Sequence, residues 1–198
     1  MTTAGPNNAG TVFDSPQYLF SGASWTNPSN AQGADDGVFA TITLAAAAPN
    51  GLQSKGFGFS IPIGSTITSH LYAVKMKSLL GDATAWALKA GVWGTSSLSG
   101  QGSIEPTTTL AWLTTTAGFQ PSVEQANDSE FGVAAYVDVN VTDTYSVDAF
   151  RITITYTIAG WSPHWPGMNL TIQNIMRWLG WKPKQYTQTR GCGEMVAV

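Results

Sequence analysis

The chain has 198 residues, of which 43% are hydrophobic and only 11% are charged, and its formal net charge is −3. A typical soluble protein has about 25% charged residues, so the polar surface here must come from Ser, Thr, Asn, Gln and Gly. Residues 1–157 hold five basic and eleven acidic side chains, whereas 158–198 hold four basic and one acidic. An acidic body disfavours broad nucleic-acid binding, and the absence of an apolar run of about 18 residues disfavours a membrane span. The composition is typical of a β protein whose surfaces are covered in a large assembly.

Residues 1–37 are rich in Gly, Pro, Asn and Ser, which predicts an extended N-terminal arm with turns rather than regular structure. From residue 38 to residue 157 the hydrophobic pattern repeats every two residues, which is the geometry of β-strands. The clearest case is 147–157, where Ile152 and Ile154 face one way and Arg151 the other. We predict strands at 38–45, 52–62, 66–79, 85–93, 107–114, 131–142 and 147–157, with long loops at 94–106 and 115–130. This pattern indicates an all-β, antiparallel β-sandwich domain over 38–157.

The pattern changes over 158–198, where a linker rich in Trp and Pro precedes a segment with helical spacing from Met168 to Gly180. A helix of about three turns is too short to be stable alone in water, so its apolar face must dock on something. Its own β-domain and a neighbouring subunit remain equally good choices. The predicted interface side chains are Trp161, Trp165, Met168, Ile172, Ile175, Met176, Leu179 and Trp181.

Catalytic chemistry is sparse in this sequence. The two histidines, His70 and His164, and the single cysteine, Cys192, lie in no spacing typical of a catalytic triad or a metal site. We expect His70 to be a packed or half-exposed strand residue. Glu105, Glu124 and Glu130 lie in or beside the long loops, but sequence cannot place two of them at the separation that glycoside hydrolysis requires. We therefore expect no enzyme, no catalytic residues and no bound cofactor.

Calcium and sugars are two further ligand classes that parts of the sequence could bind. Calcium could be bound by Asp35 and Asp36, or by Asp138, Asn140 and Asp143, although the tendency of Asp and Asn to form turns explains the same residues without an ion. We therefore predict no metal site. Sugars could stack on tryptophans in or near loops, for which Trp93 and Trp112 are the main candidates besides Trp25. Packing in the core or at subunit interfaces is the favoured role of the eight tryptophans.

The segment Trp25-Thr-Asn-Pro-Ser-Asn-Ala31, followed by Asp36-Gly37-Val-Phe-Ala-Thr41, resembles the opening W-x-N-P-x-N-A…D-G-x-Y-A-T of a family of virion proteins of tailed bacteriophages. Here Phe39 stands in place of the Tyr. The blocks 52–62 and 64–67 look like the second block of that family, and 131–133 and 147–156 look like its closing strands. The resemblance covers roughly residues 20–157, and it leaves 158–198 as a segment of this chain's own.

This resemblance implies a jelly-roll-like β-sandwich, no enzymatic activity, and a place in a virion that is assembled in the host cytoplasm. We expect a capsid decoration or cement protein that binds across subunit boundaries, with Trp25 packing inside the fold. Its partners would be the major capsid protein or neck and tail proteins, and it would form a homotrimer without nucleic acid or membrane. The alternative is a glycan-binding module for host attachment on a head fibre or tail.

Overall fold

The computed structural model describes residues 1–15, 22–47, 50–81, 86–94, 98–116, 118–137, 141–158, 186–187 and 196–197. The chain forms two compact units, Met1–Ala159 and Gly160–Val198. In the second unit, β11 (Tyr186–Thr187) pairs antiparallel with β12 (Val196–Ala197). The predicted helix at 168–180, and with it all eight predicted interface side chains from Trp161 to Trp181, lies outside the described residues.

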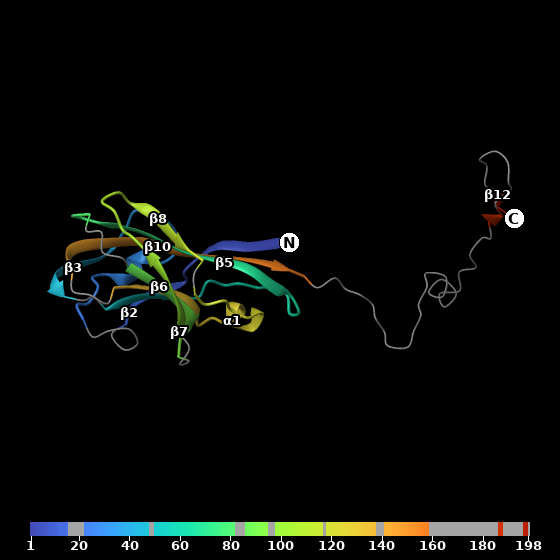
Figure 1. The fold of residues 1–198 in the computed structure, drawn as a ribbon, viewed down its shortest axis with the longest axis horizontal. Helices are drawn as coiled ribbons and strands as arrows, with labels where there is room; N and C mark the ends of the chain where they lie inside the picture. Colours follow the sequence, from blue (N-terminus) through green and yellow to red (C-terminus); the bar gives the residue numbers. More distant parts are fainter. Residues whose placement is uncertain are drawn as a thin grey trace. The chain divides into compact units, whose positions relative to one another are not determined.

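The first unit is an all-β sandwich of two antiparallel five-stranded sheets, as the sequence predicts (Figure 1). We call the sheet that contains the longest strand sheet A. Its order is β1-β10-β5-β8, and β3 also pairs with β10, because β10 is long enough to pair with β3 through its first half and with β1 through its second half. The strands of sheet A are β1 (Thr2–Asn8), β3 (Ala40–Ala47), β5 (Thr66–Ser78), β8 (Ala111–Thr115) and β10 (Val141–Thr157).

The opposite sheet, which we call sheet B, has the strand order β2-β4-β9-β6-β7. Its strands are β2 (Thr11–Ser15), β4 (Gly51–Lys55), β6 (Trp86–Val92), β7 (Leu98–Ile104) and β9 (Phe131–Tyr136). The inner faces of the two sheets enclose one hydrophobic core, to which β10 contributes Phe150, Ile152 and Ile154. Arg151 on the opposite face of β10 is only half-buried, so the predicted alternation of this strand is confirmed.

The prediction of an irregular arm at residues 1–37 is wrong. Residues 2–8 and 11–15 form β1 and β2, which are edge strands of sheets A and B. An edge strand needs hydrogen-bonding partners on one side only, so β1 tolerates Gly5 and Pro6, where its register with β10 shifts. Gly and Pro in the sequence therefore indicated turns where the fold has a strand.

Both predicted long loops also contain regular structure. The segment 94–106 contains β7, and 115–130 contains the short helix α1 (Val123–Asn127). Ser122 and Gln125 form a capping box at the start of α1, a signal that the sequence carries. Conversely, the predicted strand 52–62 ends early at Lys55 as β4, although Phe57, Phe59 and Ile61 beyond it remain buried in the core.

Candidate functional site

The segment that resembles the phage family, Trp25–Thr41, packs into the fold. The Trp25 side chain is buried, donates its indole N–H to the Asn50 carbonyl at 2.9 Å, and meets the Trp86 ring edge-on at a centroid distance of 6.0 Å. Thr26 pairs with Thr41 in an isolated antiparallel bridge. The predicted packing role of Trp25 is confirmed, and this ring is not available to a sugar.

The centre of the same segment is a single turn of 3-10 helix, η1 (Pro28–Ala31). Asn27 precedes it in the left-handed region at φ 50°, a conformation that Asn adopts more readily than most residues. Asn30 donates its side-chain amide to the Phe39 carbonyl at 3.0 Å, and Ala31 is fully buried. The Asn, Pro and Ala of this motif therefore have conformational and packing roles.

The last part of the segment meets sheet A at three charged residues, Asp35, Lys75 and Asp148, which we call the Lys75 cluster. Asp148 lies between Val147 and Ala149, where the register of β10 with β5 shifts, and its side chain is fully buried. Its Oδ1 accepts the Gly37 N–H at 3.1 Å, and its Oδ2 lies 3.2 Å from Lys75 Nζ. Lys75 Nζ also contacts Asp35 Oδ1. The hydrogen bond to Lys75 is the main cause that lowers the pKa of Asp35, and the same bond raises the pKa of Lys75.

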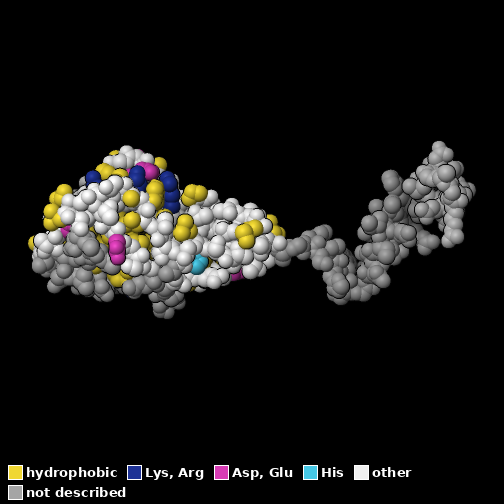
Figure 2. All heavy atoms as spheres, turned by 45° about the horizontal axis from the view of Figure 1, so that its top comes forward, with side chains coloured by type: hydrophobic (Ala, Val, Ile, Leu, Met, Phe, Trp, Pro, Cys, Tyr) yellow, Lys and Arg dark blue, Asp and Glu magenta, His cyan; other side chains and the backbone are white. Residues whose placement is uncertain are grey.

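Beside this cluster, cations of the outer face of sheet A lie over aromatic rings. The Arg151 guanidinium lies 4.2 Å from the ring centroid of Trp112, and Arg151 Nε donates to Asn8 Oδ1 at 2.8 Å. Lys77 Nζ lies 5.1 Å from the ring centroid of Phe39. Figure 2 shows basic side chains gathered among hydrophobic ones on a surface that is otherwise largely uncharged.

The two tryptophans predicted for glycan stacking differ. Trp93 is only 6% exposed and donates its indole N–H to the Ser54 carbonyl at 2.8 Å. This corrects the expectation of an exposed ring, because a sugar needs an accessible aromatic face. Trp112 is half-buried, and Arg151 lies over its ring.

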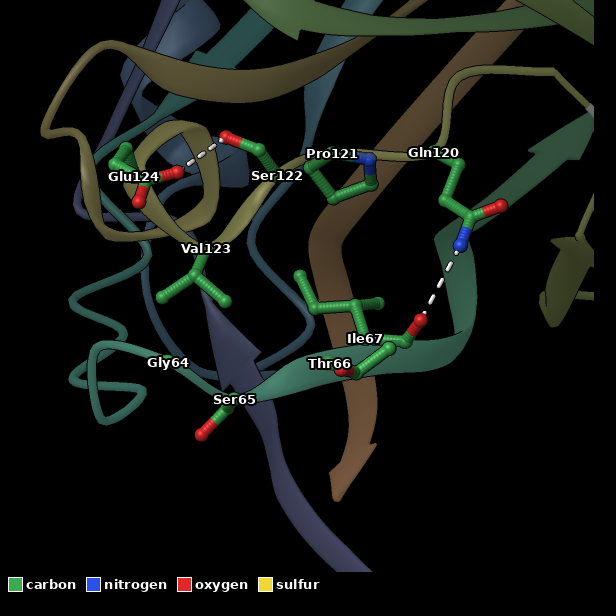
Figure 3. A pocket seen from close by; sticks show the side chains of 9 residues that line it. All are labelled: Gly64, Ser65, Thr66, Ile67, Gln120, Pro121, Ser122, Val123 and Glu124. Atoms are coloured by element: carbon green, nitrogen blue, oxygen red, sulfur yellow. Dashed lines mark hydrogen bonds between the residues drawn. The ribbon is translucent and has the colours of Figure 1, made fainter. Parts of the chain in front are cut away.

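A cavity of about 310 Å³ lies between the start of β5 and the loop that leads into α1. It is lined by Gly64–Ile67 and Gln120–Glu124 (Figure 3). Gln120 donates to the Ile67 carbonyl at 3.2 Å, and the Ser122 hydroxyl donates to Glu124 at 2.9 Å. The pKa of Glu124 is lowered, first by a backbone N–H and then by Ser122, whereas a general acid needs a raised pKa.

The other residues singled out in the sequence lie apart from this cavity. Glu130 forms an ion pair with Lys55 at 2.8 Å, and Glu105 is exposed. His70 is half-buried on β5, as predicted, with its ring centroid 4.9 Å from that of Tyr72, and burial lowers its pKa. His164 and Cys192 lie outside the described residues.

The candidate calcium ligands that the structure describes contact backbone and Lys75. Asp36 Oδ1 accepts the Val38 N–H at 2.9 Å, and the buried Asp143 accepts the N–H groups of Leu79, Leu80 and Thr144. Asp138 and Asn140 lie outside the described residues. In the part of the chain that the structure describes, no three His, Cys, Asp or Glu side chains gather where they could hold a metal ion.

Large exposed apolar side chains lie at both ends of the sandwich, with Leu79 and Leu80 just beyond β5 at one end and a second group at the other. Met1 and Ile63 are about nine-tenths exposed, and Ile158 is 58% exposed. Since Thr2 pairs with Tyr156 and Thr66 with Thr157, these three residues lie near the same end of sheet A, which is also the end of β10. This end carries the cavity as well, because Ser65 and Thr66 line it.

Comparisons with known proteins add no family to this geometry. No protein-family model matches the chain, and neither a curated protein nor a solved structure matches it. Within the described residues, no helix is long and apolar enough to cross a membrane. The fold class is that of an all-β sandwich.

The Lys75 cluster was not predicted from the sequence. Its members come from the loop before β3, from β5 and from β10. The pairing of β5 with β10 brings Lys75 to Asp148, and the contacts of the loop with these two residues add Asp35. The available signal was the placement of Lys75 on the polar face of its strand, which does not indicate its two carboxylate partners.

Proposed function

We propose that this chain is a non-enzymatic structural protein of a bacteriophage virion, acting as a capsid decoration or cement protein that binds across subunit boundaries. The observation that carries the proposal is the order of the strands. Eight consecutive strands, β3 to β10, divide between the sheets as β3-β10-β5-β8 and β4-β9-β6-β7.

We infer a jelly roll from this order. In a jelly roll the first, eighth, third and sixth strands form one sheet, and the second, seventh, fourth and fifth form the other, which is the order of the eight strands here. Jelly rolls occur in viral capsid proteins and in lectins, among others. One fold hosts many functions, so the choice of a virion role depends also on the resemblance of Trp25–Thr41.

The surface of the sandwich agrees with a role in an assembly. Lys55 and Lys75 are paired with carboxylates of the same chain, so they add little net charge that would repel a like-charged neighbouring copy. Met1, Ile63 and Ile158 expose apolar area at one end, and such clusters mark contact sites more often than scattered apolar residues do. Burial of apolar area contributes roughly 25 cal/mol per Å², and repetition over many copies would stabilise a shell.

The docking mechanism differs from the one expected from sequence. β1 and β2 are strands of the two sheets, so they are not free to reach a neighbour as an arm. Attachment would therefore depend on residues 161–198 and on the end of the sandwich that carries Met1, Ile63 and Ile158. A homotrimer remains the proposed state, with a solution mass three times that of the chain in light scattering.

Purified particles provide the test. Antibodies raised against the recombinant chain should label virions banded in a density gradient, and mass spectrometry should detect the chain in that band. A chain found only in the soluble fraction of the lysate would contradict the proposal.

Deletion of residues 161–198 then tests the attachment. The truncated chain should retain the β-sheet circular dichroism of the full chain while its binding to particles is reduced. A matched variant, Ile63→Ser, changes the exposed end only and should weaken binding by a smaller factor. Unchanged decoration by both variants would contradict the proposed docking surfaces.

A further inference from the structure

The Lys75 cluster has an arrangement that neither the fold nor the proposed function requires. We propose that Lys75 and Asp35 become joined by an intramolecular amide bond between Nζ and Cγ, with Asp148 as the proton carrier. The proposal does not depend on a virion role, since it concerns only the chemistry of one folded chain.

Three backbone segments hold the reacting groups together. Lys75 lies in the middle of β5, paired with Ala149 of β10 on one side and with Trp112 of β8 on the other. Its Nζ contacts Asp35 Oδ1 and lies 3.2 Å from Asp148 Oδ2. The Gly37 N–H holds the other oxygen of Asp148 at 3.1 Å and so connects the loop of Asp35 to the sheet. The amine therefore has little freedom to leave the two carboxyl groups.

The three side chains of the Lys75 cluster differ in burial, and the most buried one is the proposed proton carrier. The side chain of Asp148 is fully buried, whereas those of Lys75 and Asp35 are 18% and 30% exposed. A buried carboxylate beside an amine and a second carboxyl group can exchange protons with both by direct contact. After the bond to Lys75 and against the effect of burial, Asp148 also contributes to the lowered pKa of Asp35.

The proposed reaction is a condensation. The ammonium of Lys75 first passes a proton to the carboxyl pair, so that a neutral amine faces a protonated Asp35. The nitrogen lone pair attacks Cγ of Asp35 and forms the C–N bond, and the nitrogen gives its second proton to Asp148. Asp148 returns that proton to the departing hydroxyl, the C–O bond breaks, and water leaves. One amide forms, one water is released, and nothing is oxidised or reduced.

The pKa values of the reacting groups and their effective molarity decide the rate and extent of the condensation. The pKa values of Lys75 and Asp35 both favour the ion pair, so the neutral amine and the protonated carboxyl group form only a minor state, from which the condensation must start. Holding the groups in contact supplies an effective molarity on the order of 10⁵ M or more, which offsets the excess of water that opposes condensation. The bond would connect positions 40 residues apart in the chain and would secure the Trp25–Thr41 segment to sheet A.

Intact-mass measurement of the folded full-length chain tests the proposal. The expected mass is lower than the sequence mass by one water, and trypsin should yield a branched peptide that joins Lys75 to Asp35. Lys75→Arg and Asp35→Ala should restore the full sequence mass of each variant. Asp148→Asn should slow the loss of water at least tenfold, and Asp36→Asn, which changes the neighbouring carboxylate, should leave it unchanged.

The test does not depend on the folding of any variant, because the mass and the tryptic peptides of the wild-type chain alone show whether the amide bond is present. A folded wild-type chain of full sequence mass, cleaved by trypsin after Lys75, would overturn the proposal and leave an ion pair only. A branched peptide that contains Asp148 in place of Asp35 would overturn the assignment of the two carboxyl groups.

Discussion

Sheet A and sheet B differ in how far their outer faces are covered. All six residues of β9, at the centre of sheet B, are buried, so this strand is covered on both faces. Sheet A has one buried face, while its outer face carries the half-buried Lys75, Lys77 and Arg151. The difference shows that one sandwich can pair a sheet of alternating pattern with a sheet whose outer face is also closed.

Small residues allow the outer face of sheet B to close. A second hydrophobic cluster, made of Ala87, Trp93, Ala134 and Tyr136, lies on this face. Trp93 reaches across β9 at Gly132 to donate its N–H to the Ser54 carbonyl. A side chain at position 132 would occupy the same space. Sheet A needs no such restriction, because water reaches its outer side chains.

The largest expected effect concerns that glycine. In Gly132→Ala the added Cβ would lie 1.7 Å from the Ser54 carbonyl oxygen and 2.6 Å from Trp93 Nε1, so the backbone must shift. We expect a loss of at least about 4 kcal/mol, beyond the ordinary range for point mutants, measured by urea unfolding. Gly33→Ala is the control: its Cβ meets nothing within 4 Å, and at φ +80° it should cost about 1–2 kcal/mol. If both variants lost the same free energy of unfolding, the close packing around Gly132 would not be the cause of the loss.

The next effect tests whether Trp25 connects to sheet B through the core. Trp25→Ala removes the edge-on contact with Trp86 and the hydrogen bond to the Asn50 carbonyl. We expect a loss of about 3–5 kcal/mol in the free energy of unfolding. Trp25→Phe keeps most of the apolar volume and should cost less than half as much. A loss below about 1 kcal/mol for Trp25→Ala would show that the segment is only peripherally attached.

An inward-facing tyrosine of sheet A gives a pH-dependent effect. Burial raises the pKa of Tyr72 well above its ordinary value of about 10, and its hydroxyl donates to the Phe119 carbonyl at 2.7 Å. Since the folded-state pKa is the higher one, this contribution is fully present below pH 10 and is lost as the pH rises above it. Above pH 10 the free energy of unfolding should fall by up to about 1.4 kcal/mol per pH unit for this residue. Tyr72→Phe should reduce this dependence of the unfolding free energy on pH. If the dependence were unchanged in the variant, other tyrosines would be its cause.

The smallest effect concerns the outer face of sheet A. Arg151→Ala removes the guanidinium over Trp112 and the hydrogen bond to Asn8, and should cost about 0.5–1 kcal/mol because the site is partly solvated. Arg151→Lys keeps the charge and should cost less. The alanine variant also uncovers the Trp112 ring, so a glycan array on it gives that ring its best chance to bind. Sugar binding by both the wild type and the variant would favour the glycan-binding alternative.

The sequence predicted those strands whose two faces differ in polarity. The alternation in 147–157 correctly separated Ile152 and Ile154 from Arg151, because sheet A has water on one side only. It failed for β1 and β2, since polar edge strands have the composition of turns. It also missed β7 and α1, although the capping box at Ser122 was a readable signal for the helix.

The sequence by itself therefore determined the all-β class, the position of most strands and the packing role of Trp25. These follow from local patterns of polarity and size. Only the tertiary structure decided which strands are neighbours, that the first residues belong to the sheets, and that Asp35 and Asp148 meet Lys75. Such contacts depend on pairings between segments far apart in sequence, as between Thr2 and Tyr156, and no local pattern encodes the partner of a strand.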